Sequence, residues 1–292
     1  MKKLIFEGAA TALVTPFTED GLNFDAMGKL IDHQIANQID ALVICGTTGE
    51  TSTMTVEEDL EIIRYSIQKI NGRVPAIAGA GSNETKKAIQ ISQMCEEAGA
   101  DALLHVTPYY NKTTQEGLYR HFRMIAESVS LPIIVYNVPG RTGLNIDPPT
   151  AKRLSEIDNI AAIKECNLNQ VGEVARLCGD GLTIYSGDDD KVLPMMAYGG
   201  KGVISVLSNI IPKDTHEMAA SFLKGDIETC RRLQLRFMPL INALFCEVNP
   251  IPVKTALNLM GFEAGPLRMP LCPMSEKNLS LLKQAMSDYG LL

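Results

Sequence analysis

The sequence predicts a closed (β/α)8 TIM barrel with a C-terminal helical extension, and three observations lead to this fold class. Eight short apolar runs lack polar alternation, which is typical of parallel strands covered by helices on both faces. Amphipathic stretches with helical spacing separate these runs. The runs recur at steps of roughly 20–34 residues, as β-α units require, and eight consecutive units without a large insert favour a closed barrel over an open sheet.

The first predicted strand follows an N-terminus that resembles a signal peptide. Glu7 interrupts its apolar run after three residues, whereas a signal peptide needs at least about seven. We therefore interpret MKKLIFEGAATALV as a first strand. No uninterrupted apolar run approaches the roughly 18 residues of a membrane span, so no membrane partner is expected. The eight strands are predicted within residues 8–15, 41–46, 75–81, 102–108, 132–139, 160–166, 182–187 and 202–208.

The predicted helices carry start signals as well as apolar stripes. Thr55 and Glu58 form a capping-box pattern at the start of the second helix. Pro148 and Pro149 suit the first turn of the fifth. The stripe of the second helix consists of Leu60, Ile63, Ile67 and Ile70.

After about residue 211 every segment has a helical pattern. One helix completes the eighth β-α unit, and the others are expected to pack on the barrel or on a partner chain. The predicted division is a catalytic barrel at residues 1–224 and a helical extension at residues 225–292. GAGSNE at residues 79–84 lacks the third glycine of a dinucleotide fingerprint, so no dinucleotide cofactor is expected.

Composition excludes some classes of function. The net charge is −7, no basic run exceeds two residues and there is no Trp, so nucleic acid is not an expected partner. The number of cysteines is odd and no CxxC pair occurs, so neither disulfides nor a zinc site is expected. We interpret the cysteines as small buried hydrophobic residues of a protein in a reducing cytoplasm. The seven cysteines are at 45, 95, 166, 178, 230, 246 and 272.

Polar motifs stand where five of the predicted strands end, on the rim where barrel enzymes hold their active sites. In chain order they are GTTGET at 46–51, TPYYN with Tyr109 and Tyr110, YNVPGRTG with Tyr136 and Arg141, Lys164, and SGDDD at 186–190. Each motif alone is weak, but together they bring hydroxyls, phenols, a guanidinium and an amine to one rim. The four histidines lie on different elements, so no metal is expected.

This set of groups points to Schiff-base catalysis, in which a neutral lysine attacks a ketone and the iminium acidifies the neighbouring carbon. At a pKa of about 10.4 only around one lysine in 2,500 is neutral at pH 7, and burial in an apolar strand can lower that pKa by roughly 3–5 units. IAAIKEC offers Lys164 such a setting. The turn from Gly46 to Gly49 suits a carboxylate, and Arg141 suits a second one. The substrate is expected to be a small 2-oxo acid, with an acidic co-substrate.

In these motifs, and in NPIPVK at 249–254, the chain resembles the 4-hydroxy-tetrahydrodipicolinate synthase (dihydrodipicolinate synthase) family over essentially its whole length. The resemblance implies condensation of pyruvate with L-aspartate 4-semialdehyde, in the diaminopimelate route to lysine, without a cofactor. It also implies a homotetramer built from tight dimers.

The resemblance assigns roles by position. It implies that Lys164 forms the Schiff base with pyruvate and that Tyr136 carries protons near the imine. Thr47 links Tyr136 to Tyr110, which in the family crosses from a neighbouring subunit. The implied substrate-binding residues are Thr48, Arg141, Ile204 through its backbone, and the turn glycines Gly46 and Gly49.

Three alternatives stay open. Sister aldolases for N-acetylneuraminate or sugar acids share the barrel and the lysine but lack an arginine at the position of Arg141. An inactive barrel that serves as a binding protein would be expected to lose Lys164 or Tyr136. A metal-dependent hydrolase or isomerase would need histidines and carboxylates at its strand ends.

The sequence departs from lysine-inhibited members of the family. Their two effector-binding histidines correspond to Val56 and Asp59, and their glutamate corresponds to Lys87, whereas Asn83 and Tyr109 match. A lysine in place of that glutamate repels the ammonium group of the effector, although Asp59 offers a replacement anion. We expect little or no feedback inhibition by L-lysine.

Overall fold

The computed structural model describes residues 2–292, in which eight parallel strands close into a barrel. The strands follow the chain around the barrel, and the first pairs with the last, Gly8 opposite Gly202. All eight predicted strands are confirmed, as is the fold class. They are β1 (Gly8–Ala12), β4 (Ala41–Ile44), β5 (Ala76–Gly79), β6 (Ala102–Val106), β7 (Ile133–Asn137), β8 (Ile160–Glu165), β9 (Thr183–Ser186) and β10 (Gly202–Ser205).

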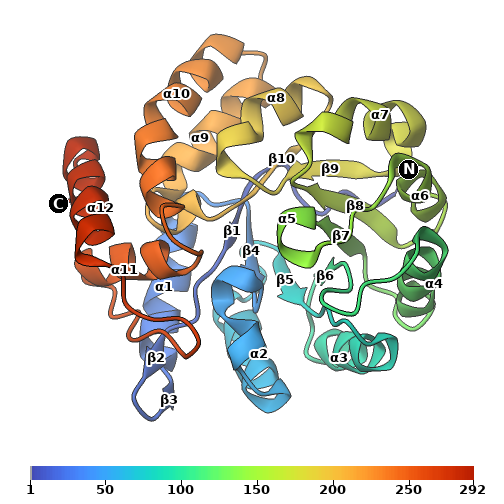
Figure 1. Cartoon of the computed structure of the whole chain (residues 1–292), viewed down its shortest axis with the longest axis horizontal. Helices are drawn as coiled ribbons and strands as arrows, with labels where there is room; N and C mark the ends of the chain where they lie inside the picture. The colour runs from blue at the N-terminus through green and yellow to red at the C-terminus, as the bar shows by residue number, and fades with distance from the viewer. Residues whose placement is uncertain (1) are drawn as a thin grey trace.

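Helices cover the outside of the barrel (Figure 1). The predicted capping box is present, because Thr55 accepts from the Glu58 backbone NH and the Glu58 carboxylate accepts from Thr55. The helices of the barrel are α1 (Phe24–Ala36), α2 (Val56–Ile70), α3 (Thr85–Glu97), α4 (Gln115–Ala126), α5 (Pro139–Thr142), α6 (Pro148–Leu154), α7 (Leu168–Cys178), α8 (Val192–Ala197) and α9 (Pro212–Leu223). Short 3-10 turns are η1 (Thr47–Gly49), η2 (Thr51–Thr53), η3 (Gly179–Gly181), η4 (Asp189–Lys191) and η5 (Leu207–Asn209).

The N-terminal segment differs from its prediction. Residues 2–7 lie outside the first strand, and Met1 lies outside the described residues. Phe6 instead stacks on Tyr185 inside the barrel, with ring centroids 4.2 Å apart, and the Tyr185 hydroxyl donates to the Phe6 carbonyl at 2.7 Å. Since Phe6 precedes β1, this pair fills the amino end of the barrel. The carboxyl end is left for the polar groups of the rim.

Two further details were not predicted. A two-residue hairpin, β2 (Phe17–Thr18) with β3 (Gly21–Leu22), follows the first strand. Cys272 is exposed, whereas Cys45, Cys95, Cys178 and Cys230 are buried as expected; all seven cysteines lie in the described residues and have free thiols. No helix within residues 2–292 is long and apolar enough to cross a membrane.

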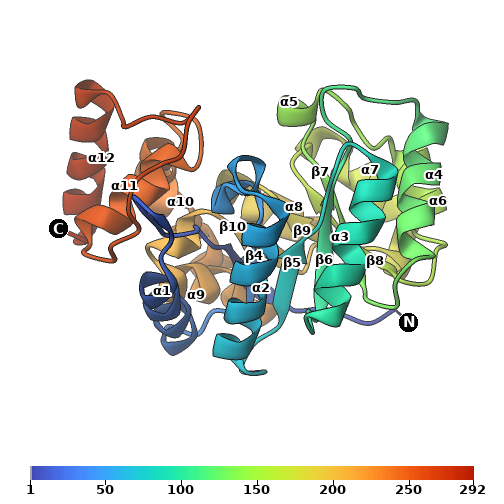
Figure 2. The same cartoon turned by 90° about the horizontal axis from the view of Figure 1, so that it is seen from below.

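The C-terminal helices form the predicted extension: α10 (Ile227–Leu244), α11 (Ile251–Leu259) and α12 (Glu276–Tyr289). Helix α10 packs against α9 and α12. Figures 1 and 2 place α12 at the edge of the molecule, on the far side from α4 and α6. Helix α9 ends at Leu223 and α10 begins at Ile227, so the predicted domain junction at residues 224 and 225 falls between the two helices. The division into two domains at this point stays a prediction.

Candidate active site

A pocket opens at the carboxyl ends of the strands and gathers most of the predicted site residues. Its lining includes Lys164 from β8, Tyr136 from β7 and Arg141 from α5. Gly46, Thr47 and Thr48 reach it from the turn after β4. The remaining lining residues are Ala12, Val43, Leu104, Val138, Gly187, Asp188, Val206, Phe245 and Asn249.

Lys164 and Tyr136 form the centre of this pocket. They are opposite each other in the register of β7 and β8, and the Lys164 Nζ lies 4.3 Å from the centroid of the Tyr136 ring. Only 5% of Lys164 and 7% of Tyr136 is exposed. Among the described residues, no carboxylate oxygen lies within 4.0 Å of the Lys164 amine. The amine is therefore buried against an aromatic face without a direct counter-ion.

Burial changes the proton affinity of both groups. Removal from water lowers the pKa of the Lys164 ammonium, and the nearby Cys166 and Asp188 offset that effect in part. The same loss of water raises the pKa of the Tyr136 phenol well above its ordinary value, because the phenolate is the charged form. The site thus favours a neutral amine beside a protonated hydroxyl.

The turn after β4 is held by contacts from two sides. Gly46 precedes η1, and the turn continues to Glu50. The Thr15 hydroxyl donates to the Gly49 carbonyl at 2.7 Å, and the Asn249 amide donates to the Thr48 hydroxyl at 3.0 Å. A side chain at Gly49 would meet Thr15 and the backbone of residue 13 at 3.1–3.2 Å, so glycine permits this close approach.

Arg141 stands at the rim, in the single turn of α5. Its guanidinium donates to the backbone carbonyl of Asn249 at 3.2 Å, and the residue lines the pocket. Since the same Asn249 also binds Thr48, one residue of the C-terminal extension connects the two predicted carboxylate-binding groups.

Three predicted residues are not part of the pocket lining. Tyr110 is 92% exposed with a positive φ of 69°, and its contact with a neighbouring subunit stays a prediction. Ile204 is fully buried in β10, inside the barrel, and the pocket is lined by Val206 further along the same chain segment. Gly49 supports the turn from outside the pocket.

Sequence analysis missed the pocket residues of the extension, Phe245 and Asn249. The signal was present for Asn249, which opens the NPIPVK motif, but no role followed from that motif alone. Asp188, from SGDDD, also lines the pocket, and its carboxylate forms an ion pair with the Lys191 ammonium.

The side chains that could bind a metal ion are not grouped as in a typical metal site within residues 2–292. Within residues 2–292, no three His, Cys, Asp or Glu side chains are grouped so that they could hold a metal ion. His105 is fully buried in β6 and contacts Ser92 at 3.2 Å, and burial lowers its pKa to about 3. The polar side chains that line the pocket carry an amine, hydroxyls, a guanidinium, the Asn249 amide and the single carboxylate of Asp188.

A (β/α)8 barrel with a buried, unpaired lysine at the carboxyl ends of its strands defines a lysine-dependent barrel lyase. The chain belongs to the dihydrodipicolinate synthetase family, whose model matches residues 5–289. This finding confirms the resemblance drawn from the sequence motifs.

Relatives and solved structures agree with that assignment. The chain is 60% identical over 292 residues to the 4-hydroxy-tetrahydrodipicolinate synthase of Acetivibrio thermocellus, with 100% of each chain covered. It is 42% identical to the solved dihydrodipicolinate synthase of Thermotoga maritima, with a TM-score of 0.97 and coverage of 99% and 100%. The enzyme of Cyanidioschyzon merolae, solved with lysine bound, is 40% identical, with a TM-score of 0.96 and coverage of 99% and 100%.

Proposed function

We propose that this chain is a 4-hydroxy-tetrahydrodipicolinate synthase that condenses pyruvate with L-aspartate 4-semialdehyde. The observation that carries the proposal is the Lys164 amine, buried without a counter-ion against Tyr136. A neutral amine in a water-poor pocket is the nucleophile that Schiff-base formation needs. The near-full-length relatives named as this synthase support the same reaction.

The reaction begins when the Lys164 nitrogen attacks the ketone carbon of pyruvate. The carbinolamine loses water to give an iminium, and Tyr136, as a phenol, donates a proton to the departing oxygen. The phenolate that this leaves on Tyr136 takes up a methyl proton, which gives the enamine and restores the phenol. The enamine carbon then attacks the aldehyde of the semialdehyde and forms the new C–C bond, and the aldehyde oxygen takes a proton from the same phenol. The amine of the condensed product then displaces Lys164 from the imine, which closes the ring and frees the enzyme.

The two carboxylates of the substrates are assigned to different groups. The Gly46–Thr48 turn offers backbone NH groups and hydroxyls to the pyruvate carboxylate, close to Lys164. Arg141, further out at the rim, offers a fork of donors to the carboxylate of the semialdehyde.

Borohydride trapping tests the proposal directly. Incubation with pyruvate and borohydride, followed by intact-mass analysis, is expected to show one reduced pyruvate per chain, and peptide mapping should locate it on Lys164. An unmodified mass in a preparation that is active would refute the Schiff-base route. An unmodified mass together with no activity is the result expected for an inactive binding barrel. Full activity after treatment with a chelator separates this route from a metal-dependent one.

Arg141→Ala is expected to impair the use of the semialdehyde far more than the reaction with pyruvate. The lost contact is a charge-assisted pair at a partly exposed rim, so we expect about a tenfold or larger fall in kcat/KM for the semialdehyde. The rate of imine formation with pyruvate should change little, and both are measured by initial rates and borohydride trapping.

Arg120→Ala is a matched control, since Arg120 is an exposed arginine of α4 paired with Glu116. Equal losses for both substrates in Arg141→Ala would make the residue structural. Efficient cleavage of N-acetylneuraminate by the unmodified chain would move the assignment to a sister aldolase.

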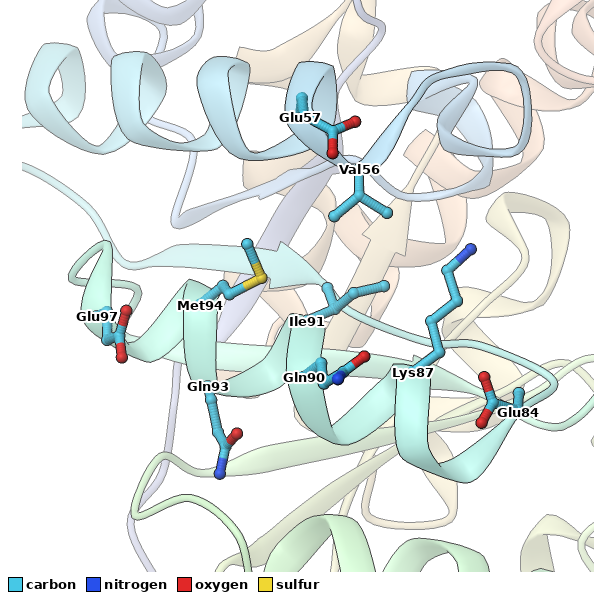
Figure 3. A pocket seen from close by; sticks show the side chains of 9 residues that line it. All are labelled: Val56, Glu57, Glu84, Lys87, Gln90, Ile91, Gln93, Met94 and Glu97. Carbon is cyan, nitrogen blue, oxygen red and sulfur yellow. The ribbon is translucent and has the colours of Figure 1, made fainter.

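We also infer that L-lysine inhibits this chain weakly or not at all. Val56, Asp59, Lys87 and Tyr109 line one cleft between α2 and α3 beside the active site. Figure 3 shows Lys87 extending from α3 toward the start of α2, where Val56 lies. Its ammonium repels the ammonium groups of a bound lysine. Burial raises the pKa of Asp59 to about 6, and the Thr51 hydroxyl donates to that carboxylate at 2.8 Å.

A titration of L-lysine against initial rate, at fixed pyruvate, measures this insensitivity. Lys87→Glu is the matched variant, because it places a carboxylate where the lysine-inhibited relatives have one, and its inhibition constant should fall at least about tenfold. Half-inhibition of the unmodified chain below about a millimolar would contradict the prediction.

We propose further that the enzyme works in the cytoplasm as a homotetramer of tight dimers. The exposure of Tyr110 supports this assembly, since the resemblance gives that residue to the active site of a neighbouring subunit. Small free thiols in the apolar interior are compatible with a reducing compartment.

A further inference from the structure

A buried ion pair joins the turn of the active site to the C-terminal extension. The Lys254 ammonium, from α11, donates to the Glu50 carboxylate at 2.7 Å, and the two side chains are only 1% and 0% exposed. The second oxygen of Glu50 accepts from the backbone NH of Arg268 at 3.0 Å. Both carboxylate oxygens of Glu50 are thus bound by residues from beyond the barrel.

The surroundings of this pair are also built from charged and aromatic groups. The Phe17 ring contacts both cations, with the Lys254 ammonium 4.0 Å and the Arg268 guanidinium 4.1 Å from its centroid. Arg268 in turn forms two hydrogen bonds to Glu58, which caps the start of α2. The pair therefore stands in a packed network with little freedom to shift.

Glu50 caps η1 and directly follows the Gly46–Gly49 turn, of which Gly46, Thr47 and Thr48 line the pocket. Its backbone has φ 57° and ψ 27°, a left-handed conformation that residues with a side chain adopt rarely. Such a conformation persists where the surroundings hold it, and it is often found at functional sites. Here the holding contacts come from Lys254 and Arg268.

We propose that Glu50 and Lys254 are positioning residues that hold the Gly46–Thr48 turn in the shape that binds the carboxylate of the 2-oxo acid substrate. Neither side chain lines the pocket, so they act through the turn. Asn249, on the segment that leads into α11, binds Thr48 from the same side. The C-terminal extension is in this way a working part of the pyruvate site. The inference rests on the proposed function, because it assigns the turn to pyruvate.

A positioning role predicts a particular kinetic pattern. A turn that binds the same carboxylate before and during the reaction contributes uniformly to both states, so its loss raises KM and leaves kcat nearly unchanged. A purely structural role predicts fewer folded molecules instead, with unchanged KM. The two roles therefore differ in a measurable way.

The test compares Glu50→Gln/Lys254→Met with the unmodified chain. The double variant removes both buried charges while keeping similar volumes, a change that often leaves stability intact, whereas either single change strands a buried charge. We expect its melting temperature to stay close to that of the parent, the KM for pyruvate to rise about tenfold or more, and kcat to change less than about threefold. The fraction of chains trapped by saturating pyruvate and borohydride counts the competent sites.

Glu263→Gln is the matched control, because it breaks an exposed ion pair between the same extension and α1, whose two side chains, Lys29 and Glu263, are 61% and 67% exposed. Its KM should match the parent. A parental KM in the double variant overturns the inference. Glu50→Asp, which keeps the charge but shortens its reach, serves if the double variant does not fold, and the same rise in KM is then required.

Pyruvate trapping on the unmodified chain distinguishes a wrong proposed function from a wrong role for Glu50 and Lys254. A chain that forms no adduct with pyruvate and borohydride removes the proposed function itself. An adduct in the unmodified chain together with unchanged KM in the variants removes only the role of Glu50 and Lys254.

Discussion

Lys164→Arg is expected to abolish both the pyruvate adduct and the condensation activity. At pH 7 about one free lysine in 2,500 is neutral, whereas for a free arginine the fraction is about one in 300,000 or less. Burial lowers the pKa of Lys164 and so increases the neutral fraction, but a guanidinium stays protonated and is a poor nucleophile. Intact-mass analysis after borohydride and a coupled rate assay measure the two losses on one preparation.

Lys201→Arg is the control for this variant, since Lys201 precedes β10 at the opposite end of the barrel and pairs with Glu7 at the surface. It should keep both adduct and rate. Activity above background in Lys164→Arg, or an adduct on another lysine of the parent, would show that the nucleophile lies elsewhere. Circular dichroism of Lys164→Arg establishes that the loss is chemical and not a failure to fold.

The barrel could be predicted because parallel strands under helices are apolar on both faces. Strands such as β7 and β8 therefore stand out as continuous apolar runs, and their polar residues, Tyr136, Asn137, Lys164 and Glu165, stand at the carboxyl ends. The hairpin of β2 and β3 is too short for any periodicity to mark it. The plug formed by Phe6 and Tyr185 joins residues far apart in the chain, and no local pattern indicates such a pair.

The same reasoning explains what could be predicted of the site. Groups at successive strand ends meet because a closed barrel brings those ends to one rim, and this located Thr47, Tyr136, Arg141 and Lys164 together. Asn249 and Lys254 reach the turn only because the extension folds back over the rim, which depends on long-range packing. Tyr110 lies outside the pocket of its own chain, so the role predicted for it requires a neighbouring subunit and stays a prediction.

The extension also changes how the fold and the chemistry relate. Barrel strands supply the amine and the phenol, whereas two of the contacts that hold the Gly46–Gly49 turn and the following Glu50 come from Asn249 and Lys254 of the extension. Because the turn is assigned to pyruvate, a change of these contacts is expected to alter the binding of the 2-oxo acid without any change near Lys164. The exposed Phe245, which follows α10 and lines the pocket, is a further residue by which the extension reaches the site.

Tyr136→Phe is expected to lower turnover by about 10²–10⁴-fold, the usual contribution of a positioned general acid or base. The ring that packs against the Lys164 amine remains, so the pocket keeps its shape and its exclusion of water. Only the hydroxyl is lost, and because burial raises the pKa of Tyr136 that hydroxyl is protonated at neutral pH. Steps that move a proton to or from the carbinolamine oxygen should slow, whereas binding of pyruvate should not. Single-turnover trapping with borohydride measures the rate of imine formation.

Tyr185→Phe is the matched control, because it removes a buried hydroxyl from β9 and leaves the pocket lining unchanged. Tyr185 lies opposite Lys164 in the register of β8 and β9. That hydroxyl donates to the Phe6 carbonyl, so its loss leaves a buried acceptor unpaired and should cost about 1–3 kcal/mol of unfolding free energy. Turnover per folded chain should remain near that of the parent. The two variants thus predict opposite patterns, with lost rate at unchanged stability for Tyr136 and lost stability at unchanged rate for Tyr185. If Tyr136→Phe kept its rate and lost stability, the hydroxyl would be structural, and the proton would have to pass through Thr47 or water.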